Sequence, residues 1–279
     1  MKLSIICPAI RTDRWTYMYE CIEESFSGEW ELILVTECEL PAELKEKTNI
    51  KVIFSERAPM QKQQQGLVHA TGEFVTVISD DSVFLPSTLD QTFNYIASRP
   101  NFDYKTIVVL KYLEGIEHEF PEWYLKQVPE DMRFKTNWDF MRADKYYWSD
   151  SHESSAMIGI PWHSPILSCA IISRQVLFEV GGWDAVFQSQ AMGNIDLSAR
   201  LMKYGCTYHI QDLIVSTCGY MKQDTGDHGP IHYAQLEEDE PLLKKMYGND
   251  FCKDRIIIDL NNWEASEPIW KRKKGRYDA

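Results

Sequence analysis

Short apolar runs that alternate with helical segments are the feature that most constrains this fold. Four such runs, rich in β-branched residues, lie near the start of the chain at Leu3–Cys7, Glu31–Thr36, Ile50–Phe54 and Phe74–Ser79. Segments with helical spacing accompany them at Trp15–Phe26, Gln61–Ala70 and Leu85–Ala97. Near-continuous apolar strands between helices are typical of a buried parallel sheet. We therefore predict an α/β fold with a mixed, mostly parallel sheet flanked by helices, and a nucleotide-binding half over residues 1–100.

The second half of the chain is less regular. Residues 114–157 are rich in Trp, Tyr, His and charged side chains without clear periodicity, which is typical of a lid or substrate-facing insertion. Regular patterns return as strands at Ser168–Ser173 and Ile210–Ser216, helices at Gln175–Val180 and Ile195–Tyr204, and a turn at Gly181–Asp184. We predict one domain over residues 1–218, divided at residue 100, and a C-terminal extension over residues 219–279.

The charge of the chain limits its partners. Its 279 residues carry a formal net charge of −13, which argues against non-specific nucleic-acid binding. A polyanionic substrate would need a local basic pocket or a metal ion. The basic tail, Lys271–Arg276, holds five positive charges in six residues. We expect this tail to contact anionic lipid headgroups or the acidic body of the protein itself, with a solvated end as the alternative.

Cysteine usage and hydropathy indicate the compartment. The seven cysteines are scattered and form no CxxC pair, so neither a zinc knuckle nor a disulfide framework is indicated. This favours a reducing compartment. No apolar stretch reaches the roughly 18 residues of a membrane span. We expect a cytoplasmic protein, with peripheral membrane contact through the tail as a further option.

Asp80 and Asp81 are the first candidate site. They stand at the carboxyl end of the fourth predicted strand, where α/β sheets bind ligands. Adjacent carboxylates suit hard divalent cations. The alternative interpretation is an ordinary turn or helix cap, which Asp-Asp-Ser also favours.

Four segments follow one another in a characteristic order. They are Ser4–Pro8, Leu34–Glu37, the stretch from Gln64 through Ile78-Ser79-Asp80-Asp81 to Pro86, and the stretch from Ser173 through Gly181–Asp184 to Asp196–Arg200. Their order and spacing resemble the GT-A glycosyltransferases, in particular the family-two class, over about residues 3 to 205. The resemblance implies a GT-A, Rossmann-like domain that transfers a hexose from a nucleoside-diphosphate sugar to a hydroxyl acceptor such as a glycan or glycolipid. Residues 101–218 would form its acceptor-side half.

The resemblance also implies a metal-dependent donor site. Asp80 would be the main ligand of Mn²⁺ or Mg²⁺, Asp81 would help to hold the metal or the ribose, and His228 would be a third ligand. His232 is a second choice for that position, and an ordinary loop histidine is the alternative. The metal would neutralise the diphosphate and stabilise the departing nucleotide.

Five further positions match the donor side of the family. Pro8 and Ala9 would form the wall beside the base, and Glu37 would accept a hydrogen bond from the uracil imide N–H, which favours UDP. Lys62 would reach a phosphate, and Gln64 occupies a donor-side position. For Glu37 and Lys62, a solvent-facing carboxylate and a surface lysine are the alternatives.

The acceptor side is predicted from aromatic and acidic residues. Trp162 and Trp183 would stack on a sugar, with His163 and Asp184 beside them, although a tryptophan in the core is the common alternative. Asp196 would be the general base of an inverting transfer. Its alternative is an i,i+4 ion pair with Arg200.

The chain departs from the family at three places. Ile78 stands at the first position of the Asp-x-Asp motif, and Gln63-Gln64 replace an arginine and an asparagine. Gly193-Asn194 stand where the family has Glu-Asp, the customary base; retaining enzymes that carry Asn there need no such base. Two other functions therefore stay open, a catalytically silent sugar-nucleotide binding protein and a nucleotidyltransferase. The second would be expected to have a glycine-rich basic loop after the first strand, and residues 7–15 contain no glycine.

Overall fold

The main sheet follows from the apolar runs. The computed structural model describes residues 1–80, 82–84, 86–113, 146–147, 170–217, 229–247 and 255–272. Within them, five strands form this sheet in the order β3 (Ile50–Phe54), β2 (Glu29–Thr36), β1 (Lys2–Pro8), β4 (Phe74–Val77) and β8 (Ile172–Ser173). Pairing is parallel except between β4 and β8. The prediction of an α/β fold with a mixed, mostly parallel sheet is confirmed.

Both faces of the sheet are covered, which explains the near-continuous apolar runs. In β1, Ile6 packs into one core, whereas Leu3 and Ile5 pack into the other. The first core also contains side chains from α2 (Pro59–Val68), α6 (Arg174–Val180), α7 (Gln190–Lys203) and α9 (Glu240–Tyr247), and the second from α1 (Thr12–Ser25) and α3 (Thr88–Ala97). The predicted helices flanking the sheet are thus present.

A smaller sheet extends the fold beyond β8. Its described strands lie in the order β5 (Ser82–Phe84), β9 (Thr207–Thr217), β6 (Thr106–Leu113) and β7 (Tyr146–Tyr147). β6 and β9 are parallel, and an isolated antiparallel bridge joins Val108 of β6 to Ile171. β5 and β6 were not predicted from the sequence.

Two expectations differ from the structure. Helix α7 begins at Gln190, five residues before the predicted start at Ile195. Of the predicted insertion at 114–157, the structure describes Tyr146–Tyr147 alone, as β7. In the part of the chain that is described, no helix has both the length and the apolar character needed to cross a bilayer.

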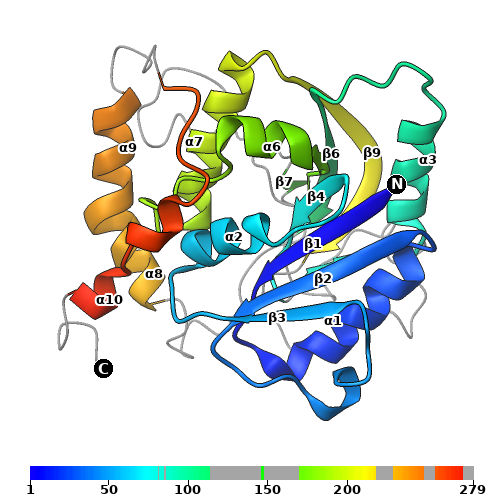
Figure 1. Cartoon of the computed structure of the whole chain (residues 1–279), viewed down its shortest axis with the longest axis horizontal. Helices are drawn as coiled ribbons and strands as arrows, with labels where there is room; N and C mark the ends of the chain where they lie inside the picture. The colour runs from blue at the N-terminus through cyan, green and yellow to red at the C-terminus, as the bar shows by residue number, and fades with distance from the viewer. Residues whose placement is uncertain are drawn as a thin grey trace.

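A 3-10 turn at Ala42–Leu44 contributes Leu44 to the second core, with α1 and α3. The remaining elements lie on the α2 side of the sheet and are α8 (Gly229–Ala234), a π-helical turn at Gln235–Asp239 that leads into α9, a 3-10 turn at Asn262–Ala265 and α10 (Ile269–Arg272). Figure 1 shows α8, α9 and α10, in orange and red, on the side where α2 and α7 lie, away from α1 and α3. We call residues 255–272, which run over α2 and end in α10, the C-terminal segment.

Candidate functional site

A pocket opens at the carboxyl ends of the parallel strands. β2 and β3 lie on one side of β1 and β4 lies on the other, so the strand order reverses between β1 and β4. Such a switch point leaves the crevice in which α/β proteins bind ligands. A pocket of about 720 Å³ lies there, lined by Pro8–Arg11 after β1 and by Ser79–Asp80 after β4. The topology of the sheet therefore places this candidate site.

Five of the seven predicted donor-side residues line this one pocket. They come from four separate stretches of the chain and are Pro8, Ala9, Glu37, Lys62 and Asp80. Pro8, Ala9 and Asp80 are strand-end positions, whereas Lys62 projects from α2. Asp81 lies outside the described residues, and Gln64 does not line the pocket.

Asp80 is held tightly by the loop that precedes α1. Its Oδ2 accepts the backbone N–H groups of Ile10 at 2.6 Å and Arg11 at 2.7 Å, and its Oδ1 pairs with the Arg11 guanidinium at 2.5 Å. The residue is 1% exposed. Placed in this way, Asp80 does not fit a divalent cation, because the ion would share the carboxylate with Arg11.

The other predicted metal ligands are not described. Asp81 and His228 lie outside the described residues, and so does the side chain of His232, whose backbone belongs to α8. Among the described residues, no group of three or more His, Cys, Asp or Glu side chains is arranged to hold a metal ion.

Lys62 is not the surface lysine of the alternative interpretation. Its side chain is 4% exposed, and its ammonium group pairs with Glu37, whose side chain is 40% exposed on the pocket wall. A buried ammonium group needs such a partner, since loss of hydration is costly. Lys62 and Glu37 therefore form one polar unit in the pocket.

The pocket also contains cations that the sequence did not identify as site residues. Arg11, Arg57 and Lys271 join Lys62, so the described lining holds four basic side chains against the three acids Glu37, Glu56 and Asp80. The described lining is therefore slightly basic on a chain of charge −13, and Arg11, Lys62 and Lys271 each pair with one of these acids. In the sequence, Lys271 belongs to the basic tail, whereas no pattern in the sequence indicates a site role for Arg57.

The opposite wall comes from segments far along the chain. It is formed by Ser189–Ala191 at the start of α7, Pro230–Ile231 of α8 and Trp270–Lys271 of α10. Ser189 is held in place because the buried carboxylate of Asp239 accepts its N–H at 2.6 Å.

Gln64 ties α2 to two distant loops. Its side-chain N–H donates to the carbonyls of Gly181 at 2.9 Å and Leu260 at 2.7 Å, and its oxygen accepts the N–H of Trp183 at 2.7 Å. Both its amide nitrogen and its oxygen are thus engaged inside the protein, which favours a structural role for Gln64 over the predicted donor-side role.

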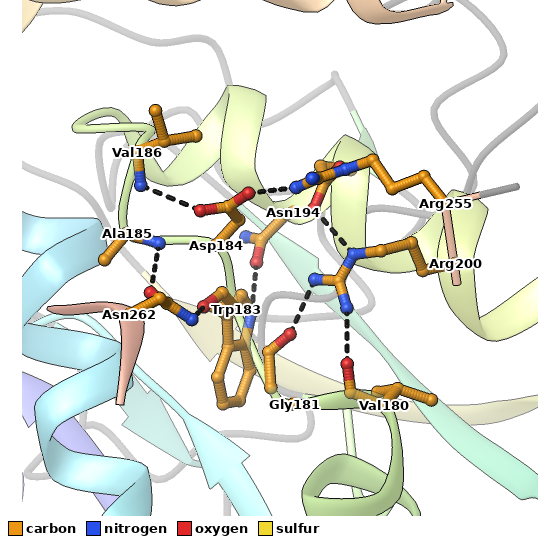
Figure 2. A network of polar contacts seen from close by, with 12 residues as sticks. Val180, Gly181, Trp183, Asp184, Ala185, Val186, Asn194, Arg200, Arg255 and Asn262 are labelled. Carbon is orange, nitrogen blue, oxygen red and sulfur yellow. Dashed lines mark hydrogen bonds and ion pairs between the residues drawn. The ribbon is translucent and has the colours of Figure 1, made fainter. Parts of the chain in front are cut away.

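Trp183 and Asp184 lie away from the pocket. Trp183 is 1% exposed, and its indole N–H donates to Asn194 at 3.0 Å (Figure 2). This favours the alternative of a core tryptophan over a sugar platform. Asp184 pairs with Arg255 of the C-terminal segment and accepts the N–H of Val186 at 3.0 Å (Figure 2). The other predicted acceptor residues, Trp162 and His163, lie outside the described residues.

Asp196 lies at the centre of a buried ion network. It is 0% exposed; Oδ2 pairs with Arg200 at 2.8 Å, and Oδ1 contacts Arg255 at 3.1 Å and the Tyr247 hydroxyl at 2.5 Å. Burial alone favours the neutral acid, but the guanidinium groups of Arg200 and Arg255 keep the pKa of Asp196 below its usual value. The structure favours the i,i+4 alternative over the general base, because Asp196 does not reach the pocket.

Asn194 lies inside α7, because this helix begins at Gln190, and its side-chain Oδ1 accepts the Trp183 indole N–H. Known proteins add no further assignment: the sequence matches no protein-family profile and no curated protein.

Proposed function

We propose that the chain is a GT-A glycosyltransferase that binds a nucleoside-diphosphate sugar in the switch-point pocket. The observation that carries the proposal is the convergence of Pro8, Ala9, Glu37, Lys62 and Asp80 on one 720 Å³ pocket. Each of these residues also holds a donor-side position in the segments that resemble the GT-A glycosyltransferases. A pocket of this size suits a nucleotide sugar.

Different residues of the lining suit different parts of the donor. Pro8 and Ala9 offer an apolar wall for a flat base, and Glu37 offers a carboxylate acceptor for an imide N–H, which is why UDP is the preferred nucleotide. Lys62 and Arg57 supply positive charge for the diphosphate. Arg11, held by Asp80, fixes the loop between β1 and α1 against the ligand.

The Mn²⁺ or Mg²⁺ site that the resemblance implies at Asp80, Asp81 and His228 forms no part of this proposal, because the Asp80 carboxylate is engaged by Arg11. The described side chains themselves bind and orient the donor.

A silent sugar-nucleotide binding protein is the second candidate. It is favoured by the burial of Asp196, because the acid predicted to remove the acceptor proton contacts Arg200 instead. A binding protein keeps the donor pocket and lacks turnover.

Two measurements test the proposal. Calorimetry with UDP, GDP, CDP and dTDP, each with Mn²⁺ and with EDTA, should detect heat for UDP, and no heat with any of the four would refute the donor site. Hydrolysis of a panel of UDP-sugars without acceptor then separates the enzyme from the silent binder.

A matched pair of variants locates the site. Glu37→Gln, which removes the carboxylate acceptor for the imide N–H of the base, should weaken UDP binding, whereas pyrophosphate, which has no base, should bind no more weakly because Lys62 is released. Glu39→Gln changes an exposed acid two residues away that does not line the pocket, and should leave binding unchanged. Equal affinities for the two variants would place the nucleotide elsewhere.

A further inference from the structure

The C-terminal segment is fastened to the body so that α10 forms one wall of the pocket. The Leu260 carbonyl accepts the side-chain N–H of Gln64 at 2.7 Å, and the Ile269 N–H donates to the Gln188 side chain at 2.5 Å. The first contact precedes α10 and the second is made by the first residue of α10, and Lys271 of this helix lines the pocket. Residues from the far end of the described chain therefore complete a site that begins at β1.

Two lysines from distant parts of the chain line the pocket. Lys271 pairs with Glu56 at 2.6 Å, and Lys62, from α2, pairs with Glu37. Hydrogen bonding and attraction from Lys271, with further attraction from Lys62, lower the pKa of Glu56. Both lysines line the same pocket, and the carboxylate of Glu56 is attracted by each of them.

The carboxylates that hold these lysines are exposed to solvent. The side chains of Lys271 and Glu56 are 37% and 55% exposed, and a solvated ion pair of this kind contributes little free energy, so a diphosphate can replace Glu56 as the partner of Lys271 at small cost. Glu37 is 40% exposed but its partner Lys62 is buried, so a diphosphate that replaces Glu37 must supply the counter-charge that this ammonium group requires. Asp80, in contrast, is 1% exposed and engaged by Arg11, so it offers a cation no equivalent opening.

We propose that the pocket binds the diphosphate of its ligand directly through Lys62 and Lys271, without a divalent metal, and that the C-terminal segment is thereby part of the binding site. The identity of the ligand as a nucleotide sugar rests on the function proposed above. The recognition of a diphosphate does not, and it can be tested with inorganic pyrophosphate.

The test uses the full-length chain in buffer that contains EDTA and no divalent ion. Calorimetry with pyrophosphate should detect binding to the wild type. Lys271→Ala should bind roughly tenfold more weakly, as expected for the loss of one charge-assisted contact, and Lys271→Arg should retain most of the affinity. Glu56→Gln, which releases Lys271, should bind more tightly than the wild type.

Arg272→Ala is the matched control. Arg272 is the next residue of α10, pairs with Glu238 and does not line the pocket, so its variant should bind pyrophosphate like the wild type. Thermal melting of both variants establishes that α10 substitutions leave the protein folded. No binding of pyrophosphate in EDTA, or equal affinities of Lys271→Ala and the wild type, would overturn the proposal.

A parallel titration with UDP separates this inference from the proposed function. If UDP binds and Lys271→Ala has no effect on either ligand, the direct contact is wrong and the donor assignment stands. If pyrophosphate binds in a Lys271-dependent manner while no nucleotide binds, the diphosphate site stands and the nucleotide-sugar assignment is wrong.

Discussion

Asp196 shows how one buried carboxylate can organise a region of the fold. Arg200, which is also 0% exposed, donates to Asp196 and to the carbonyls of Val180 and Gly182 at 3.0 and 2.6 Å. Asp196→Asn would leave this guanidinium buried without its counter-charge. We expect it to lower the free energy of unfolding by roughly 3–5 kcal/mol, measured by urea denaturation.

The control for Asp196→Asn is an exposed ion pair. Glu23→Gln breaks the surface contact with Lys47 and should cost about 0–1 kcal/mol. If Asp196→Asn instead unfolds at the wild-type urea concentration and loses turnover, the general-base interpretation of Asp196 is correct.

Asp239 makes stability depend on pH. Burial raises the pKa of this carboxyl to about 7, against hydrogen bonds from the N–H groups of Ser189 and Gln188, while nearby Glu238 raises it further and Arg272 lowers it. The folded state thus holds a proton that the unfolded state releases near pH 4, so stability from this group is lost as the pH rises from about 4 to about 7.

Asp239→Asn removes this titration. The amide keeps an oxygen for the two N–H groups, so the variant should be more stable than the wild type at pH 8, by roughly 1–3 kcal/mol, with a flatter profile of stability between pH 4 and 7. Urea denaturation at several pH values measures both. Glu39→Gln should keep the wild-type slope, and an Asp239→Asn profile parallel to the wild type would contradict the assignment.

At the scale of elements, the turn after α6 fastens the C-terminal segment. Gly181 has φ +81°, and an added Cβ there would collide with the backbone carbonyl of Ile258. Gly181→Ala should therefore destabilise the protein by about 2–4 kcal/mol and loosen the segment, so that trypsin cleaves at Lys271 and Arg272 sooner.

Gly205→Ala is the control that separates backbone strain at a positive φ from displacement of the C-terminal segment. Gly205 has a similar φ of +89°, but nothing lies within 4 Å of its would-be Cβ. It should show the strain alone, roughly 1–2 kcal/mol, without faster cleavage in the segment. Equal proteolysis of the two variants would mean that Gly181 does not control docking.

Local pattern predicts elements well where both faces of a strand are buried. β1 and β2 match their apolar runs because successive side chains meet the two cores, whereas β3 matches its run at the edge of the sheet, where Val52 and Phe54 are 44% and 69% exposed. The start of α7 was misplaced because Gly193 and Asn194 lower helix propensity, whereas packing overrides it: an added Cβ at Gly193 would collide with Met60.

The candidate site likewise contains residues that the sequence can predict and residues that it cannot. The strand-end residues Pro8, Ala9 and Asp80 could be predicted, because a parallel sheet brings its carboxyl ends together whatever the side chains. Lys271 could not be placed, because its position depends on contacts such as that between Gln64 and Leu260, 196 residues apart. No periodicity encodes a contact at that separation, and the burial of Asp196 also arises from a distant partner, Arg255.

At the scale of the whole molecule, we expect the acidic charge of the body to compete with anionic lipid for the basic tail. Lys271 and Arg272 pair with Glu56 and Glu238 on a chain of charge −13. We therefore expect the full-length protein to stay in solution with phosphatidylserine vesicles at about 0.15 M salt, where exposed charges are screened beyond ~8 Å. Sedimentation measures this, and pelleting with these vesicles but not with phosphatidylcholine vesicles would support lipid contact.

The separation between the two walls of the pocket also sets an order of events during synthesis. Lys271 and its partner Glu56 are 215 residues apart, so a ribosome completes the β1–β4 wall long before it produces α10. A nascent chain can fold its parallel strands without the residues that close the site. Ligand can then add to stability only once the last wall has been made, which makes competence to bind a late event in the life of each molecule.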